Sequence, residues 1–563
     1  MLNINYISIW ILSIFTNKYF FMTSAILVIA FMLSTENESR HSPPDPSKPL
    51  PPSSSRIQYF KKAAISSDAG GCAQIGRDIL QKNGSAVDAA IAAMICNSVL
   101  NMQSAGLGGG FFMTIFRKSE DKVYCLNARE TAPLHASEDL YRYSQSGTKN
   151  GSLAVGVPGE IKGYKIAHER FGKLPWKDLV QPVIDICDNG YIMSRHQYWS
   201  MSRRKLEEDN NFRILSINGP EDFYTGSSSK MFLEDIEDIG GIITEEDLIQ
   251  YRAEWLEPIH ITLKNGDHFY SFPPPGCGAI TALILNVLEG YNFTRRDLYE
   301  SDIASTYHRI LEAFKFGLAQ RAALGDPNFV DIKKIVEQIT SKEFATDIRL
   351  KINLDKTNSS TNYYGAKYFS NEDYGTAHLS ILDGNGDAVA ATSTINIYFG
   401  SGLSSKRTGI VLNSAMDDFA YSDIINYFGI PVSEANKMKP GKRPLSSMSP
   451  SILVDKNGNV KTVIGAAGGP KIITAIALTL ARVLWFGDNL KEAIDAARVH
   501  HQLFPMEAHY EYGLLKDIVN KLKSMGHKLE RKSDSIVYAL HRDENNIMGI
   551  VDQRKDGGGV YGI

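Results

Sequence analysis

The sequence lacks an excess of charge of either sign. Its 60 lysine and arginine residues nearly balance 63 aspartate and glutamate residues, so the formal net charge is −3 at pH 7. Because proteins bind nucleic acid largely through basic side chains that displace counterions from phosphates, we expect no nucleic-acid partner. Internal repeats are also missing. The length of 563 residues predicts roughly two to four domain-sized units.

Cysteine is scarce, with five residues and no closely spaced metal-binding pattern. His500 and His501 are adjacent rather than at the i, i+4 spacing of a helical metal site, so we expect no metal and no cofactor. Cys72 and Cys96 can pair in an oxidising compartment. That pairing leaves three cysteines over: Cys125, Cys187 and Cys277. Cys187 ends an apolar run, which predicts a small buried hydrophobic residue.

Long apolar runs are confined to the N-terminus. Tyr6–Phe15 and Tyr19–Leu33 are separated by little more than Lys18, and together they are long enough to cross a bilayer. The lysine before the stronger run and the acidic residues after it place the rest of the chain outside the cytosol. We therefore expect residues 1–40 to be a cytoplasmic tail and signal-anchor of a single-pass type II membrane protein. A cleaved signal peptide and a secreted protein are the alternative, although no clear cleavage site follows.

Proline and serine dominate the next segment, residues 41–57. Pro43–Ser55 contains six prolines and four serines, which is typical of an extended stalk. Glycosylation sequons are expected to carry glycan at some of their positions in the secretory pathway. They occur at Asn37, Asn83, Asn150, Asn292 and Asn358.

Two helices are predicted after this segment, over Gly71–Gln81 and Ser85–Leu100. The second is so rich in alanine and other apolar residues that it must be packed on most sides. A glycine-rich stretch, Ser104–Gly110, then leads into a strand at Phe112–Phe116. A phosphate-binding loop needs the opposite order, from strand to helix. We therefore interpret these glycines as positions of close backbone packing.

A β-hairpin is predicted over Asp373–Asn396. Apolar residues alternate on both arms, and Asp383–Asp387 between them has the glycine and asparagine of a turn. Thr376 opens the first arm directly after Gly375. If the bond between these two residues is cut, Thr376 carries a free α-amine beside its hydroxyl. Such a threonine combines a nucleophile with its own base.

The other elements alternate between helix and strand. A long amphipathic helix is predicted from Ile303, capped by Ser301. Downstream of the hairpin, Gly409–Asn413 is predicted as a strand and Gly465–Pro470 as the opening of a helix that reaches Trp485. Helices followed by strands flanked by helices favour a layered α+β sandwich.

Several motifs follow one another in a characteristic order. They are Ser104–Gly110, Asn127–Glu130, Thr376–Ser380, Thr392–Asn396, Pro444–Met448 and Gly465–Gly469. Together they resemble the γ-glutamyltransferase (glutathione hydrolase) family, and the resemblance extends from about Ala64 to the C-terminus. It implies an α+β N-terminal-nucleophile (Ntn) hydrolase, a four-layer αββα sandwich that cleaves itself. The products would be a large subunit, residues 58–375, and a small catalytic subunit, residues 376–563, which stay associated as one domain.

The resemblance also implies roles for the catalytic residues. Thr376 matches the nucleophile, and its freed amine is the general base. Thr394 matches the threonine that orients the amine and hydroxyl. The backbone N–H groups of Gly468 and Gly469 match the donors to the tetrahedral oxyanion. His378 is interpreted as a packing or hydrogen-bonding residue rather than a second base.

Substrate recognition follows from the same resemblance. The substrates implied are glutathione, its conjugates and other γ-glutamyl compounds, and the acceptors are water, amino acids or dipeptides. Arg129 matches the clamp for the substrate α-carboxylate, where a guanidinium can form two parallel hydrogen bonds. The residues matched to the carboxylate or the ammonium group are Arg129, Ser446, Ser447, Asn396 and Asp418. Cys72 and Cys96 look like a disulfide of animal members.

One position departs from the family pattern. Typical members have an acidic or amide residue three places before the aspartate that matches Asp418, and this chain has Ala415. Losing one charge-assisted hydrogen bond to the substrate ammonium costs about 1.5–3 kcal/mol of binding. A catalytically weakened paralogue that acts as a binding or decoy protein is therefore the alternative function. An amidase for a different acyl group is less favoured, because the other recognition residues are present.

Overall fold

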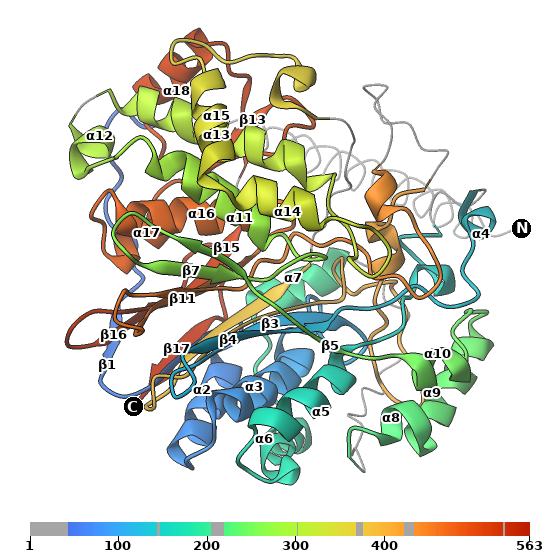
Figure 1. Cartoon of the computed structure of the whole chain (residues 1–563). Helices are drawn as coiled ribbons and strands as arrows, with labels where there is room; N and C mark the ends of the chain where they lie inside the picture. The colour runs from blue at the N-terminus through green and yellow to red at the C-terminus, as the bar shows by residue number, and fades with distance from the viewer. Residues whose placement is uncertain are drawn as a thin grey trace, which may run out of the picture.

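Two seven-stranded sheets lie face to face at the centre of the molecule, and helices cover the outer face of each (Figure 1). This four-layer αββα arrangement is the predicted one. The computed structural model describes residues 43–142, 147–203, 219–300, 302–366, 375–421, 433–532 and 535–563. The predicted anchor, the sequon at Asn37 and the predicted cap Ser301 lie outside the described residues.

The first sheet contains the strand that follows Thr376. Helices α2 (Gly70–Gln81), α3 (Ala86–Leu100), α5 (Glu160–Phe171) and α6 (Trp176–Asn189) cover its outer side. In spatial order its strands are β17 (Gly559–Gly562), β2 (Ala64–Ser67), β8 (Ala377–Leu382), β9 (Ala388–Thr394), β3 (Gly110–Arg117), β4 (Lys122–Ala128) and β5 (Glu254–Leu256). Strands β8 and β9 form the predicted hairpin, with Ala377 opposite Ser393.

The second sheet contains the strand that leads to the two predicted oxyanion glycines. Its outer face is covered by α11 (Gly278–Glu289), α13 (Ile303–Arg321) and α16 (Lys471–Leu484). In spatial order its strands are β1 (Gln58–Phe60), β16 (Ile547–Ile550), β15 (Ile536–Arg542), β11 (Val460–Ala467), β10 (Ser451–Val454), β7 (His268–Ser271) and β6 (Ile259–Thr262).

Shorter elements complete the described residues. A three-stranded sheet has the order β12 (Val499–His501), β13 (Ala508–Tyr510), β14 (Leu529–Arg531). The remaining helices are α4 (Glu138–Arg142), α7 (Arg195–Arg203), α8 (Asp222–Thr225), α9 (Ser227–Asp238), α10 (Glu245–Gln250), α12 (Arg295–Tyr299), α14 (Lys333–Thr340), α15 (Lys342–Lys351), α17 (Leu490–Asp495) and α18 (Lys516–Ser524). The 3₁₀ turns are η1 (Ser152–Ala154), η2 (Thr361–Tyr364), η3 (Ala415–Asp418) and η4 (Glu434–Asn436).

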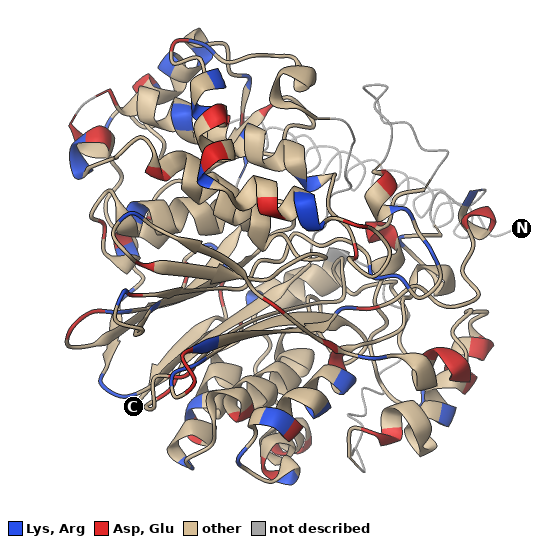
Figure 2. Cartoon of the chain, viewed as in Figure 1, with Lys and Arg blue, Asp and Glu red and all other residues tan. Residues whose placement is uncertain are grey.

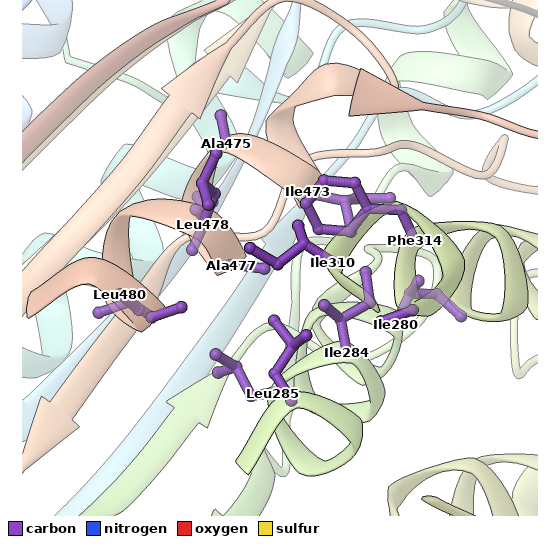
Figure 3. Packing of buried hydrophobic residues seen from close by; sticks show 14 of the residues in the cluster. Ile280, Ile284, Leu285, Ile310, Phe314, Ile473, Ala475, Ala477, Leu478 and Leu480 are labelled. Carbon is purple, nitrogen blue, oxygen red and sulfur yellow. The ribbon is translucent and has the colours of Figure 1, made fainter. Parts of the chain in front are cut away.

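Apolar side chains fill three layers. One lies between the first sheet and its helices, a second between the two sheets, and a third between the second sheet and α11, α13 and α16. In the third layer Ile284, Ile310 and Ile473 come from three different helices and meet at one point (Figure 3). Figure 2 shows that lysine, arginine, aspartate and glutamate lie mainly on the outer helices and loops. Burial on this scale is the main force that holds the layers together.

Three predictions about local structure were wrong. Gly409–Asn413 is not a strand, because its groups bond within their own loop: Leu412 N–H donates to the carbonyl of Leu403 at 2.9 Å, and Val411 forms only an isolated bridge. Helix α13 is capped by Asp302, whose carboxylate accepts the N–H of Ser305. Cys187 is exposed rather than buried, because its position on α6 faces away from the sheet.

The predicted stalk is extended but not detached. No helix or strand occurs over residues 43–57. Asp45 nevertheless accepts a hydrogen bond from Tyr510 at 2.9 Å and forms an ion pair with Arg531 at 2.7 Å. The carbonyl of Pro46 also accepts the N–H of Lys516 at 2.8 Å. The segment therefore lies along the C-terminal part of the chain.

Four of the predicted sequons lie within the described residues. Asn83, Asn150 and Asn292 are exposed, whereas Asn358 is half-buried. Glycosylation of these residues stays a prediction. No helix in the described part of the chain is both long and apolar enough to cross a bilayer.

The disulfide between Cys72 of α2 and Cys96 of α3 is confirmed. It closes a loop with a sequence separation of 24 residues. Closing such a loop restricts the unfolded chain, which corresponds to about 3 kcal/mol of stabilisation in the chain-entropy model.

The double variant Cys72→Ser/Cys96→Ser should therefore unfold at a lower denaturant concentration, with a free energy of unfolding lower by about 3 kcal/mol. Urea titration followed by fluorescence measures this change. Cys187→Ser, at an exposed free thiol, is the matched control and should leave the midpoint unchanged. An unchanged midpoint in the double variant would show that the bond contributes nothing to stability.

Candidate active site

Thr376 is placed at the centre of the molecule by the strand that follows it. Strand β8 lies between β2 and β9 in the first sheet and packs against β11 of the second. The threonine directly precedes β8 and its side chain is buried. A nucleophile in this place is held by strands on three sides, as precise catalysis requires.

Thr394, predicted to orient the nucleophile, contacts the bond that is predicted to be cut. Its hydroxyl donates to the carbonyl oxygen of Gly375, and its oxygen accepts the N–H of Asn396 at 2.9 Å. The structure therefore brings Thr394 and the Gly375–Thr376 bond together. Gly375 has φ of +152°, and a Cβ there would lie 2.7 Å from the carbonyl oxygen of Asn396. Only glycine fits at this position without strain.

The glycine-rich stretch supports Thr394 from the other side, as close packing predicts. A Cβ on Gly109 would lie 2.2 Å from the carbonyl oxygen of Thr394, and one on Gly108 would lie 2.1 Å from that of Val411. Real Cβ atoms do not approach backbone oxygens so closely. The glycines let three backbone segments meet directly beside Thr394.

Gly468 and Gly469 occupy the turn between β11 and α16. Their φ angles are +122° and +59°, in the region that favours glycine. Their carbonyls accept N–H groups of the first turn of α16, from Lys471 at 3.3 Å and Ile472 at 3.0 Å. Within the described residues, neither glycine N–H donates to a backbone carbonyl. Two unpaired donors at a helix N-terminus are suited to an oxyanion.

His378 is a structural residue, as predicted. The single hydroxyl hydrogen of Ser380 goes to the carbonyl of Tyr538 at 3.1 Å, so Ser380 must accept from Nε2–H of His378 at 3.0 Å. The other ring nitrogen, Nδ1, then accepts from the hydroxyl of Thr392 at 2.8 Å. Burial lowers the pKa of His378 to about 3, so the ring is neutral. A Cβ on Gly465 of β11 would lie 2.2 Å from this ring.

Arg129 and Asp418, predicted to bind opposite ends of a substrate, bind each other. The arginine directly follows β4 and is fully buried. Its guanidinium forms ion pairs with Asp418 and, at 3.1 Å, with Glu130. The carboxylate of an amino-acid substrate could pair with Arg129, and its ammonium group could pair with Asp418. Each residue would then exchange its present partner for a substrate group of the same charge. The pair therefore has one group of each charge, as binding of an α-amino acid would require.

Two further predicted recognition residues have buried polar atoms without a partner. Asn396 donates its side-chain N–H to the carbonyl of Ser414 at 2.8 Å, which fixes the orientation of the amide. Its carbonyl oxygen Oδ1 then has no hydrogen-bond partner, and neither does the hydroxyl of Ser447. An unpaired acceptor suits an ammonium group, and an unpaired hydroxyl suits a carboxylate. Ser446 is also buried, and its oxygen accepts the N–H of Met448 at 3.3 Å.

Ala415 is buried in the same loop, in the 3₁₀ turn that carries Asp418. Its methyl group and the Cβ of Glu130 each lie 3.3 Å from the place that a Cβ would take on Gly156. Nothing in the sequence indicated a role for Asn413. Its side-chain oxygen accepts the N–H groups of Gly156 and Ala415, both at 2.9 Å. The loop is therefore tightly fixed, and at position 415 it presents only a methyl group.

Glu160 is a second residue that the sequence did not reveal. Its buried carboxyl accepts the hydroxyl of Ser393, next to Thr394, at 3.0 Å and that of Tyr164 at 2.5 Å. Burial raises its pKa from 4.5 to about 8, and the hydroxyl donors only partly oppose this shift. The only sequence signal is an acidic residue in the first turn of α5, which is common. The raised pKa of Glu160 comes from tertiary packing, which a local sequence pattern does not reveal.

Two side-chain groups outside the catalytic centre have ligand atoms within 4.8 Å of one another, as a metal ion would require. The first is His308, Glu312 and His527, and the second is Glu507, His509 and Glu530. Glu312 already bonds Thr357 at 2.6 Å and Lys315 at 3.1 Å, and Glu530 pairs with Lys532. Lysine partners satisfy these carboxylates, so we interpret both groups as hydrogen-bonded networks.

Several known proteins have sequences similar to that of this chain. The family model described as gamma-glutamyltranspeptidase matches residues 72–213 and 209–562. The chain is 38% identical over 543 residues to scoloptoxin SSD14 of Scolopendra dehaani, covering 91% of this chain and 94% of that protein. It is also 38% identical over 487 residues to glutathione hydrolase 5 proenzyme of Mus musculus, covering 80% and 83%.

A solved structure supports the fold. The cephalosporin acylase from Bacillus halodurans superposes with a TM-score of 0.76 and 24% sequence identity, covering 93% of this chain and 99% of that one. At this identity the likeness concerns the fold alone. It agrees with the two packed sheets and their outer helices.

The pKa of Glu160 gives a test of the packing behind Thr394. Below about pH 4.5 the carboxyl is protonated in both the folded and unfolded states. As the pH rises toward 8, only the unfolded state releases the proton, so folding stability falls. Glu160→Gln removes this loss. Relative to the wild type, its free energy of unfolding should rise by about 1.4 kcal/mol per pH unit between roughly pH 5 and 8.

Urea unfolding at several pH values measures this difference. Glu169→Gln, at an exposed position of the same helix, is the control and should show no such slope. A constant difference between Glu160→Gln and the wild type across the range would contradict a buried, neutral Glu160.

Proposed function

The chain belongs to the gamma-glutamyltranspeptidase family, and on that premise we propose that Thr376 is its nucleophile, released by cleavage after Gly375. The chain is a γ-glutamyl hydrolase and transferase. Its substrates are glutathione and other γ-glutamyl compounds. The proposal for the individual residues is supported above all by Thr394, whose hydroxyl donates to the carbonyl of Gly375.

Maturation uses the same atoms. The hydroxyl oxygen of Thr376 attacks the carbonyl carbon of Gly375, whose oxygen is polarised by Thr394. The C–N bond breaks as the C–O bond forms, and the nitrogen takes up the hydroxyl proton. Water then hydrolyses the resulting ester. The products are a carboxylate on Gly375 and a free α-amine on Thr376, so no cofactor is required.

Catalysis then follows with the freed amine as base. The amine accepts the hydroxyl proton as Thr376 attacks the γ-amide carbonyl of the donor, and the N–H groups of Gly468 and Gly469 hold the oxyanion. The leaving amine takes the proton, and a γ-glutamyl ester remains on Thr376. Water or the amino group of an amino acid or dipeptide attacks this ester, which regenerates the hydroxyl.

The donor is held by its α-amino acid end. Its α-carboxylate pairs with Arg129 and the hydroxyls of Ser446 and Ser447, and its ammonium pairs with Asp418 and the carbonyl oxygen of Asn396. The support is that Asn396 and Ser447 have buried, unpartnered atoms of the required kind. Arg129 and Asp418 are freed to bind the donor when it separates their ion pair.

Location and modification are part of the same proposal. An enzyme anchored in the cell membrane by residues 1–40 would carry its catalytic domain outside the cell, and a secreted enzyme is the alternative. The disulfide Cys72–Cys96 supports an oxidising compartment. The exposed sequons at Asn83, Asn150 and Asn292 support glycosylation.

Wild-type protein should separate into two fragments on a denaturing gel, and N-terminal sequencing of the smaller should begin at Thr376. Thr376→Ala, which removes the attacking oxygen, should remain a single chain of about 62.4 kDa before glycosylation. Thr376→Ser keeps a hydroxyl and serves as the matched control, with fragments again expected. Normal cleavage of the alanine variant would exclude Thr376 as the processing nucleophile.

Binding or decoy activity of a catalytically weakened paralogue is the second candidate function. The observation that favours it is Ala415, in the 3₁₀ turn that carries Asp418. Ala415→Asn supplies a hydrogen-bond acceptor beside Asp418. We expect KM for a γ-glutamyl anilide to fall about ten- to hundred-fold, because one charge-assisted contact contributes about 1.5–3 kcal/mol, while kcat stays within about two-fold.

The steady-state rates of both proteins decide between the two functions. Fast turnover by the wild type, with no gain in Ala415→Asn, would exclude weakening by Ala415. Turnover that is detectable only in the variant would support a binding or decoy role for the natural chain. Ala420→Asn, just outside the same turn, is the control and should not lower KM.

A further inference from the structure

A buried ion pair contacts β8, the strand that directly follows Thr376. Lys555, just before β17, donates its Nζ–H to Asp68 Oδ1 at 2.6 Å, and both side chains are buried. The second oxygen of Asp68, Oδ2, accepts the backbone N–H of His378 at 2.6 Å. His378 lies two residues after Thr376. The ion pair therefore acts on the backbone of the catalytic strand.

The geometry of β8 places the future amine on the same side as this pair. In a β-strand, the N–H groups of residues i and i+2 point toward the same edge. That edge of β8 is paired with β2, with Ser67 opposite Leu379. Thr376 directly precedes β8, and the carbonyl of Gly375 faces Thr394 of β9. Because the C=O and N–H of one trans peptide point in opposite directions, the nitrogen of Thr376 lies on the side of Asp68. It is roughly 7 Å along the strand from the nitrogen of His378.

Other titratable groups near the ion pair are neutral. Burial lowers the pKa of His378 to about 3 and that of His196, on α7, to about 4. Burial also raises the pKa of Tyr538 on β15 well above its usual range, and the carboxylate of Asp68 adds to this shift. Asn101, which accepts from Lys555 at 3.2 Å, is uncharged.

The charged groups that remain belong to other contacts. The carboxylate of Asp556 accepts the first N–H groups of α7, from Arg195 and His196. On the substrate side, Arg129 and Asp418 neutralise each other, and burial raises the pKa of Glu130. Among the described residues on the β2 edge of β8, Asp68 and Lys555 are thus the two opposite charges closest to the amine.

We propose that Asp68 and Lys555 form a positioning and charge-balancing pair for the α-amine of Thr376. Asp68 holds the amine-bearing edge of β8 through the N–H of His378. Lys555 cancels the negative field that Asp68 alone would place on the amine, so that the amine stays an unprotonated base at neutral pH. This inference rests on the proposed role of Thr376.

Charge balance predicts opposite effects for the two partners. Without Lys555, the carboxylate of Asp68 favours the protonated amine and raises its pKa. Without the charge of Asp68, the ammonium of Lys555 disfavours that form and lowers the amine pKa. At a separation of roughly 8 Å and an effective dielectric constant of about 20, either change amounts to roughly 1.5 pH units.

The acid limb of kcat/KM for a γ-glutamyl anilide reports the pKa of the base in the free enzyme. Lys555→Met should move this limb to higher pH by roughly 1.5 units, and Asp68→Asn should move it to lower pH by a similar amount. The double variant Asp68→Asn/Lys555→Met should return it to the wild-type position, and Lys555→Arg should leave it there.

A second ion pair provides matched controls. Lys461 of β11 and Asp267, just before β7, pair at 2.9 Å at the second sheet, whereas β2 and β8 belong to the first. Lys461→Met and Asp267→Asn make the same chemical changes, and neither should move the acid limb. A merely structural role of Asp68 and Lys555 would lower kcat without shifts of opposite sign.

Each remaining outcome decides the inference. Limbs that move in the same direction, or not at all, overturn it. A single variant could fail to cleave itself, and the double variant then decides. Its cleavage, with the acid limb of kcat/KM at the wild-type pH, supports the charge balance. An uncleaved double variant overturns it. An inactive wild type with Thr376→Ala still cleaved removes the proposed function as well. An active wild type with unmoved limbs removes this inference alone.

Discussion

The contact between the ring of His378 and the backbone of Gly465 sets the distance on which the active site depends. Strand β8 follows Thr376, the proposed nucleophile, and β11 leads to Gly468 and Gly469, the proposed oxyanion donors, so these two strands must be held at one separation. The neutral imidazole fills the space between them, fixed by Thr392 on one nitrogen and Ser380 on the other. Any side chain on Gly465 would push the sheets apart, since even a Cβ would lie 2.2 Å from the ring.

Around this contact, charged groups of the site form ion pairs with one another while no ligand is bound. Arg129 and Asp418 form a buried ion pair, which would be costly if either were left alone. In the proposed binding mode a zwitterionic substrate would substitute for both partners at once, so that neither charge is left unpaired. The hydroxyl of Ser447 and the amide oxygen of Asn396 are unpaired already, and these two unpaired atoms support the proposed place of the substrate.

Local pattern in the sequence predicted most elements, because alternation and helical period report which faces are buried. The hairpin of β8 and β9 and the alanine-rich helix α3 are where the pattern placed them. Gly409–Asn413 has the composition of a strand but finds no partner strand, which composition cannot reveal. Family motifs indicated Thr376 and Arg129. The pairing of Asp68 with Lys555 spans 487 positions, so only the folded chain brings it to light.

Both sheets contain strands from the two sides of the Gly375–Thr376 bond. In the first sheet β2 lies between β17 and β8, and in the second β1 pairs with β16 and β7 with β10. A cut at that bond creates two polypeptides that share every layer of the core, so neither keeps a complete sheet by itself. The mature enzyme should therefore behave as a single cooperative unit in unfolding. Dilution cannot separate its halves unless the hydrogen-bonded ladders break first.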